Sequence, residues 1–182
     1  MKFKQQAVYA LLTAILAGVV TFVTQKMGGW PNPTCMENAN ALTYISFATW
    51  ACYFVAGCSL KGGLNWLWSM FGGAICAALM FILTFAFMGS MGYFIGVSVA
   101  VIIIVWFMMF PEKVKMNGAG VFIGTALFFA MHASAPGYID GSIAKYCNII
   151  LTEMVYTVIG LAAGWLTIWF SQITAPLGKD KE

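Results

Sequence analysis

An acidic side chain and a histidine lie inside long apolar stretches, and they are the first candidates for chemistry. Glu153 is the only acidic residue within such a stretch, and His132 is the only histidine of the chain. A charge deep in a bilayer costs at least about 2.5–3.5 kcal/mol on insertion scales, so a retained one marks a candidate functional site. At helical spacing, Glu153 shares a face with Tyr156, Gly160 and Gly164. We therefore expect Glu153 and Tyr156 to face the interior of a helix bundle.

His132 falls on a second inward stripe, together with Gly120, Gly124 and Phe128. We expect His132 and Glu153 in the same half of the membrane, where a pair could gate with pH, relay protons or bind a polar solute. Two structural alternatives stay open. Glu153 would then be a protonated carboxyl group bonded to a neighbouring helix, and His132 an interfacial residue bonded to loop backbone.

Aromatic side chains suggest a constriction on the path of a solute. Most tryptophans of membrane proteins belong to the interfacial belt, but Trp50 lies in the middle of an apolar stretch, beside Tyr53 and Phe54. Phe128 and Phe129 occupy a corresponding place later in the chain. An aromatic ring near a carboxylate suits an amine or ammonium-type cation, whereas a constriction without charge suits a small neutral molecule.

The five cysteines do not form a metal-binding pattern. We expect Cys35 and Cys147 on the outer side of the membrane, where they could form a disulfide. The other three lie in apolar stretches and resemble small apolar residues. One histidine cannot provide two ligands for a haem, and the sequence contains no nucleophile–base set. We expect no metal, no cofactor and no enzymatic activity.

Composition identifies the elements that must position these residues. The chain has 182 residues, of which 62% are hydrophobic and only 8% charged, against about 25% charged residues in soluble domains. This excludes a soluble or disordered chain, and the net charge of +3 is no nucleic-acid footprint. A membrane-spanning helix needs about 20 apolar residues. We predict one all-α transmembrane domain over residues 1–182, with six spans at residues 7–24, 41–58, 64–87, 93–110, 118–133 and 147–170.

Lysines predict the orientation of these spans. Seven of the nine lysines fall on one side if the N-terminus is cytoplasmic, and only Lys26 and Lys145 fall on the other. Because positive residues favour the cytoplasmic side, we expect both termini there. The first span resembles a secretory signal, but no convincing cleavage site follows it, so we expect it to be retained. Large residues such as Ile102, Ile103, Ile104 and Met80 are expected to face lipid or another subunit.

The second and fifth spans resemble each other. At an offset of 75 residues, Phe47, Ala51, Phe54, Ser59 and Gly62 match Phe122, Ala126, Phe129, Ser134 and Gly137. Each half then contains three spans, so the halves have opposite orientations. Inverted repeats are common in transporters, although chance similarity between two apolar helices is the alternative.

Two segments resemble a known family. They are Trp-Ala-Cys-Tyr-Phe-Val-Ala-Gly at 50–57, continued by Leu-Lys-Gly-Gly at 60–63, and Gly-Ala-Gly-Val-Phe-Ile-Gly-Thr at 118–125. They resemble the YcdZ-like bacterial inner-membrane proteins, a family of unknown function. The resemblance implies a multi-pass protein of the bacterial inner membrane. It brings no reaction, substrate or site residue.

These observations favour a channel or facilitator for a small solute, with its pore inside the bundle. A single buried acid and no arginine favour small amines, ammonium-type cations or urea-like molecules over anions. The alternatives are a membrane anchor for an enzyme complex and a pH sensor using His132. The expected partners are the lipid bilayer, a small solute and further copies of the chain, with no nucleic acid.

Overall fold

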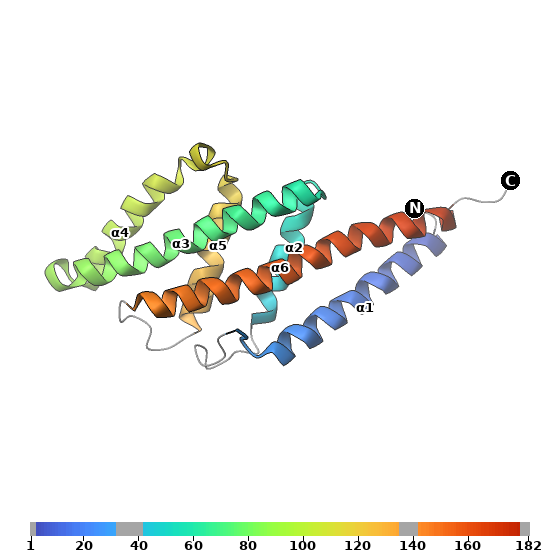
Figure 1. The fold of residues 1–182 in the computed structure, drawn as a ribbon, viewed down its shortest axis with the longest axis horizontal. Helices are drawn as coiled ribbons and strands as arrows, with labels where there is room; N and C mark the ends of the chain where they lie inside the picture. The colour runs from blue at the N-terminus through green and yellow to red at the C-terminus, as the bar shows by residue number, and fades with distance from the viewer. Residues whose placement is uncertain (1–2, 32–41, 135–141, 179–182) are drawn as a thin grey trace.

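The computed structural model describes residues 3–31, 42–134 and 142–178, and these residues form helices joined by turns (Figure 1). The six α-helices and two short 3-10 helices are α1 (Phe3–Met27), α2 (Thr43–Val55), α3 (Leu60–Met91), α4 (Tyr93–Met108), η3 (Pro111–Val114), α5 (Gly118–Ala133), α6 (Ile143–Thr174) and η4 (Ala175–Gly178). The predicted all-α class is confirmed.

Helix length divides these elements into two groups. Helices α1, α3 and α6 contain 25, 32 and 32 residues and are long and apolar enough to cross a membrane. Helices α2, α4 and α5 contain 13, 16 and 16 residues. Helices α3 and α6 begin and end four residues beyond the predicted spans, because an apolar window detects only the part suited to the hydrocarbon core. The described residues therefore contain three candidate spans, which indicate a membrane protein.

Local signals account for several helix ends. The Ser59 side chain accepts a hydrogen bond from the Gly62 amide, 3.1 Å away, and caps the start of α3. Asn117 caps α5 in the same way, through the Gly120 amide at 3.2 Å. Gly92 separates α3 from α4 with a φ of 77°, which an L side chain rarely adopts.

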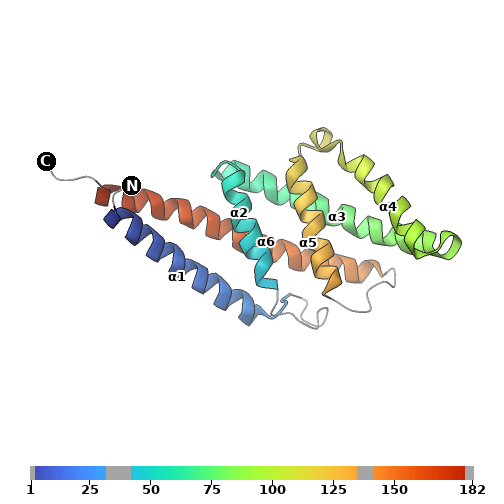
Figure 2. The ribbon, with the colours of Figure 1, turned by 180° about the vertical axis from the view of Figure 1, so that it is seen from behind.

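The two long helices α3 and α6 form the centre of the arrangement, and they run side by side in Figures 1 and 2. Helix α3 packs mainly on α4 and α5, whereas α6 packs mainly on α2 and α1. Each long helix therefore packs on a short helix that is distant in sequence: α3 on α5, and α6 on α2.

Glycines allow these pairs to come close together. A Cβ atom at Gly124 would overlap the Met70 backbone, and one at Gly73 would overlap the Val121 carbonyl. In the other pair, a Cβ atom at Gly160 would overlap both Ser46 and Thr49. Small residues at helix contacts are typical of membrane proteins, and the predicted inward positions of Gly120, Gly124, Gly160 and Gly164 are confirmed.

One prediction about the surface is wrong in part. Ile102 is exposed, but Met80 and Ile104 are buried in one cluster with Met108 and Val121. The reason is that α4 packs along α3, so residues that would suit lipid cover each other instead. Hydrophobicity alone does not distinguish a lipid-facing side chain from one between two helices.

Candidate functional site

Glu153 lies on α6 and has no exposed surface. Neither carboxyl oxygen has a hydrogen-bond partner among the described residues. Buried polar groups are nearly always hydrogen-bonded, so an exception calls for an explanation. The prediction that Glu153 faces the bundle interior is confirmed, but the alternative in which it bonds to a neighbouring helix has no support in the described contacts.

Thr157, one helical turn after Glu153, shows the same anomaly. Its hydroxyl is fully buried and also lacks a hydrogen-bond partner in the described part of the chain. The other buried threonines all donate to the carbonyl four residues earlier: Thr24, Thr49, Thr84, Thr125, Thr152, Thr167 and Thr174. Because residues four apart share a face of a helix, the Thr157 hydroxyl is a second oxygen without a hydrogen bond among the described residues on the face of α6 that carries Glu153.

Tyr44 on α2 contributes a third such oxygen. Its hydroxyl is buried and has no hydrogen-bond partner among the described residues, and it lies within electrostatic reach of Glu153. The register of α2 and α6 explains this proximity, because the Ser46 hydroxyl donates to the Tyr156 carbonyl at 2.9 Å. Tyr44 precedes Ser46 on α2, and Glu153 precedes Tyr156 on α6, so both lie on the N-terminal side of that bond. We name Tyr44, Glu153 and Thr157 the buried polar cluster.

Tyr156 faces inward as predicted, but its hydroxyl is already engaged. It accepts a hydrogen bond from the Gly29 amide at 3.1 Å and donates to the Thr24 carbonyl at 3.2 Å. Thr24 lies in the last turn of α1, and Gly29 follows the end of that helix. Tyr156 therefore anchors α1 to α6, and its hydroxyl is not available to the cluster.

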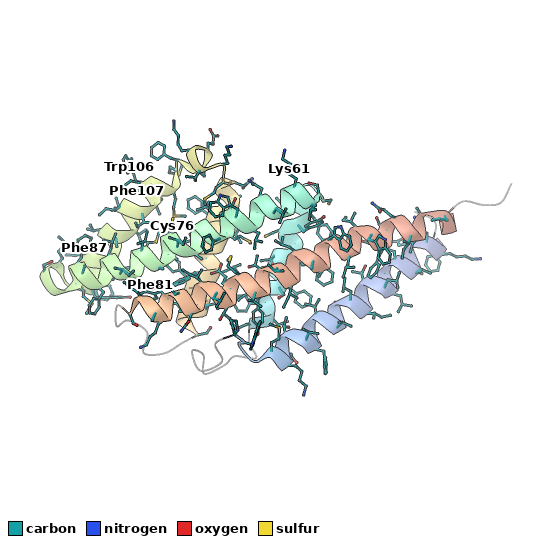
Figure 3. All side chains as sticks on the ribbon, viewed as in Figure 1. Lys61, Cys76, Phe81, Phe87, Trp106 and Phe107 are labelled. Carbon is teal, nitrogen blue, oxygen red and sulfur yellow. The ribbon has the colours of Figure 1, made fainter. Side chains whose placement is uncertain are left out.

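His132 lies on α5 and is largely buried, as predicted. Its ring stacks on Phe81 with 3.8 Å between centroids, and Tyr146 lies 6.1 Å away. Figure 3 shows Phe81 on the side of α3 that faces the start of α6. Since neither Glu153 oxygen has a hydrogen-bond partner in the described part of the chain, which includes His132, the two residues do not form a hydrogen-bonded pair.

The five aromatic residues of the predicted constriction occupy two places. Phe128 is buried and Phe129 half-buried, and both rings contact Phe81 of α3, with centroids 6.1 and 5.4 Å from its ring. On α2, the Trp50 indole donates to the Thr167 hydroxyl at 3.0 Å, and the Tyr53 ring lies against Gly63 and Gly164. Phe54 is 41% exposed. No ring contact between the two places is seen in the described residues, so the constriction stays a prediction.

Cavities in the described structure lie in grooves between helices. One of about 380 Å³ is lined by α1, α2 and α6 and includes Trp50, Phe54 and Thr167. Another of about 260 Å³ lies between α3 and α6 and includes Tyr53 and Trp165. Glu153 and His132 line neither. Tyr44 and Thr157 line neither as well, so no residue of the buried polar cluster borders these two grooves.

The remaining predictions concern sulfur and metals. Cys35 lies outside the described residues, so the disulfide with the exposed Cys147 stays a prediction. Within residues 3–31, 42–134 and 142–178, no three His, Cys, Asp or Glu side chains come together as metal ligands.

The sequence missed Tyr44 and Thr157. Thr157 had a usable signal, because it lies four residues after Glu153 and shares its face. Tyr44 had none, since its place depends on how α2 packs against α6.

Comparison with known proteins identifies a family but no activity. No curated protein and no solved structure matches the chain. One family model does, described as a protein of unknown function (DUF1097), and it covers residues 10–172. This range includes all six α-helices in whole or in large part and every residue of the buried polar cluster. The chain therefore belongs to the DUF1097 family.

Proposed function

We propose that the protein is a facilitator for a small solute, with six membrane-spanning helices and the solute path near the centre of the bundle. The observation that carries this proposal is Glu153, which is fully buried and has no hydrogen-bond partner among the described residues. An acid retained in a membrane helix usually serves a transport path or proton movement. The likeness to the YcdZ-like proteins favours the bacterial inner membrane as its location.

The arrangement of the turns supports six spans. In Figure 1 the α2–α3 turn and η3 lie along the upper edge, while the ends of α1 and α5 and the start of α6 lie along the lower edge. Lys61 projects at the upper edge in Figure 3. This distribution agrees with a cytoplasmic upper edge, because Lys113 and Lys115 belong to the same side of the chain.

The packing of the long helices supports an inverted repeat. Gly160 of α6 lies against the Ser46 carbonyl of α2, and Gly73 of α3 lies against the Val121 carbonyl of α5. Ser46 and Val121 are 75 residues apart (121 − 46), the offset that aligns the second and fifth spans. Each long helix would then pack on the middle helix of the opposite half. In transporters with inverted repeats, the substrate site lies near the interface of the repeats.

The chemistry of the site favours cationic or neutral solutes. The ionisable groups of the buried polar cluster are the Glu153 carboxyl and the Tyr44 phenol. The chain has no arginine that could hold an anion. Small amines, ammonium-type cations and urea-like molecules remain the preferred classes.

Stopped-flow light scattering tests the proposal. The purified protein is reconstituted in liposomes and challenged with urea, glycerol, ammonium, methylammonium, acetate and formate. We expect flux of one solute class above that of protein-free liposomes, and we expect Glu153→Gln to alter it. Glu112→Gln is the matched control, because Glu112 is an exposed acid on η3.

Each other outcome has a defined meaning. Flux that Glu153→Gln leaves unchanged would retain transport but remove Glu153 from the path. No flux for any solute, with folded and inserted protein, would contradict the proposal and favour an anchor subunit or a pH sensor.

A further inference from the structure

The space around Glu153 limits which ligand its carboxyl group can hold. The side chain has no surface that a water-sized sphere can touch, and the described residues offer neither oxygen a hydrogen bond. An ionised carboxylate in such a place would lose its hydration without compensation, at a cost of several kcal/mol or more. A neutral carboxyl group avoids most of this cost. The geometry therefore favours the protonated form in this conformation.

Within the part of the chain that the structure describes, no lysine or histidine is hydrogen-bonded to a Glu153 oxygen. Besides Glu153, the titratable side chains on α6 and on the elements packed against it are Lys4, Tyr9 and Lys26 on α1, Tyr44, Cys52 and Tyr53 on α2, Lys61 and Cys76 on α3, His132 on α5, and Lys145, Tyr146, Cys147 and Tyr156 on α6. Lys26 is exposed and lies over the Phe22 ring, and Lys61 is exposed at the start of α3. His132 stacks on Phe81. Tyr44 lies within electrostatic reach of Glu153 and is itself neutral unless it loses a proton.

We propose that Glu153 is a proton-binding site whose proton is the co-substrate of transport. This inference rests on the proposed function and deepens it. In the conformation described here, the buried polar cluster holds the proton on a Glu153 oxygen. When the bundle opens to one side, the carboxyl group meets water and releases the proton, leaving a carboxylate. The carboxylate stays in contact with water until the bundle opens to the opposite side, where it takes up the next proton and is buried again, so one proton crosses in each full cycle.

A proton fits this site better than a solute cation does. An ammonium-type ion would need room for at least one nitrogen atom and several oxygen ligands, and no such room adjoins Glu153. A proton requires no additional space. The solute itself would bind elsewhere on the path, once the bundle has opened.

The interface next to the cluster suits a change of conformation. Helices α2 and α6 meet through Gly160 and Gly164 on one side and Ser46, Thr49 and Tyr53 on the other. Small sliding movements of packed helices are one way in which proteins change conformation, and the small residues Gly160, Gly164 and Ser46 place no large side chain in the way of such a movement. A movement of α2 against α6 would also move Tyr44, which lies within electrostatic reach of Glu153.

Infrared spectroscopy tests the protonation directly and does not depend on any solute. A protonated carboxyl group gives a C=O stretch that an ionised one lacks and that shifts in D2O. At pH 7 we expect this band in the wild type and in Glu112→Gln, and its loss in Glu153→Gln. Absence of the band in folded wild-type protein would overturn the proton site.

Coupling is tested in liposomes that contain a pH-sensitive dye. With methylammonium or urea as the probe, we expect solute flux to change the internal pH in the wild type and in Glu112→Gln. In Glu153→Gln we expect complete loss of the coupled pH change, while exchange of labelled solute across the membrane continues. Exchange also shows that the variant is folded.

The outcomes separate the two proposals. Solute flux with an unchanged pH in the wild type, or an equal pH change in Glu153→Gln, would overturn the coupling but keep the facilitator. No flux of any solute would overturn the facilitator and with it the coupling, whereas the infrared band would still decide whether Glu153 holds a proton.

Discussion

Helices α3 and α6 have the same length and similar partners, yet they carry different side chains at corresponding positions. Each contains 32 residues and packs on a short helix through a glycine, Gly73 in α3 and Gly160 in α6. If the two helices are aligned through these glycines, an offset of 87 residues (160 − 73), Glu153 corresponds to Trp66 and Thr157 to Met70. The same framework therefore carries large apolar side chains in one half and unpartnered polar ones in the other.

Hydrogen bonding shows the same difference. In the α3–α5 contact, the Thr125 hydroxyl donates to the Gly73 carbonyl at 3.0 Å. Ser69 donates to the Asn65 carbonyl at 2.7 Å and accepts from the Asn117 amide at 2.7 Å. In the α2–α6 contact, Glu153 and Thr157 have no such partners among the described residues. In the first contact, these hydrogen bonds satisfy the Thr125 and Ser69 hydroxyls. The second keeps polar groups that packing does not require, which is why we look for function there.

The largest effect is expected from filling the close contacts. Gly73→Ala and Gly160→Ala each place a Cβ atom against a backbone carbonyl of the partner helix, so each should destabilise the protein by about 1–3 kcal/mol. The check is thermal unfolding in detergent. Gly18→Ala is the control, because nothing lies within 4 Å of a Cβ atom there, and it should leave stability unchanged or raise it by about 0.5–1 kcal/mol. Very unequal losses at Gly73 and Gly160 would contradict the comparison between the two halves.

The next largest effect on stability is expected from substitutions at Glu153 of α6 and at Trp66, the corresponding position of α3. Glu153→Met replaces an uncompensated polar group with an apolar one of similar size and should raise stability by about 1–3 kcal/mol. The reverse change, Trp66→Glu, should lower stability by more than this, because it adds both a cavity and a buried acid. Thermal unfolding of both variants measures the difference. A loss of stability in Glu153→Met would show that Glu153 has a structural role and would weaken its assignment to transport.

The sequence predicted much of the individual helices and little of their pairing. Helix α5 begins and ends at the predicted residues, because Asn117 caps it and the apolar run stops at Ala133. The inward position of Glu153 followed from the small residues on its face of α6. The pairing of α6 with α2, and with it the position of Tyr44, depends on contacts between distant segments that no local pattern records. For the same reason, Met80 and Ile104 were assigned to the surface, although α3 and α4 bury them against each other.

Two threonines allow the finest comparison of the two halves, with the smallest expected effect. Thr125→Val removes a hydroxyl that donates across the α3–α5 contact, so it should cost about 0.5–1.5 kcal/mol. Thr157→Val has the same shape change but removes a hydroxyl with no hydrogen-bond partner among the described residues. Because nothing is broken and a buried polar group is removed, stability should stay equal or rise slightly. Thermal unfolding of both variants in one detergent compares them directly.

For the effect on transport, we expect the opposite order of the same two variants. If Thr157 belongs to the site that handles the proton, Thr157→Val should change the pH coupled to solute flux, whereas Thr125→Val should not. The liposome assay with the internal dye measures both. We expect Thr125→Val to be less stable with unchanged coupling, and Thr157→Val to be equally stable with altered coupling. This result would separate the half of the molecule that serves packing from the half that serves function. If Thr157→Val proved the more destabilising of the two, its hydroxyl would have a structural partner, and the contrast between α3 and α6 would lose its main support.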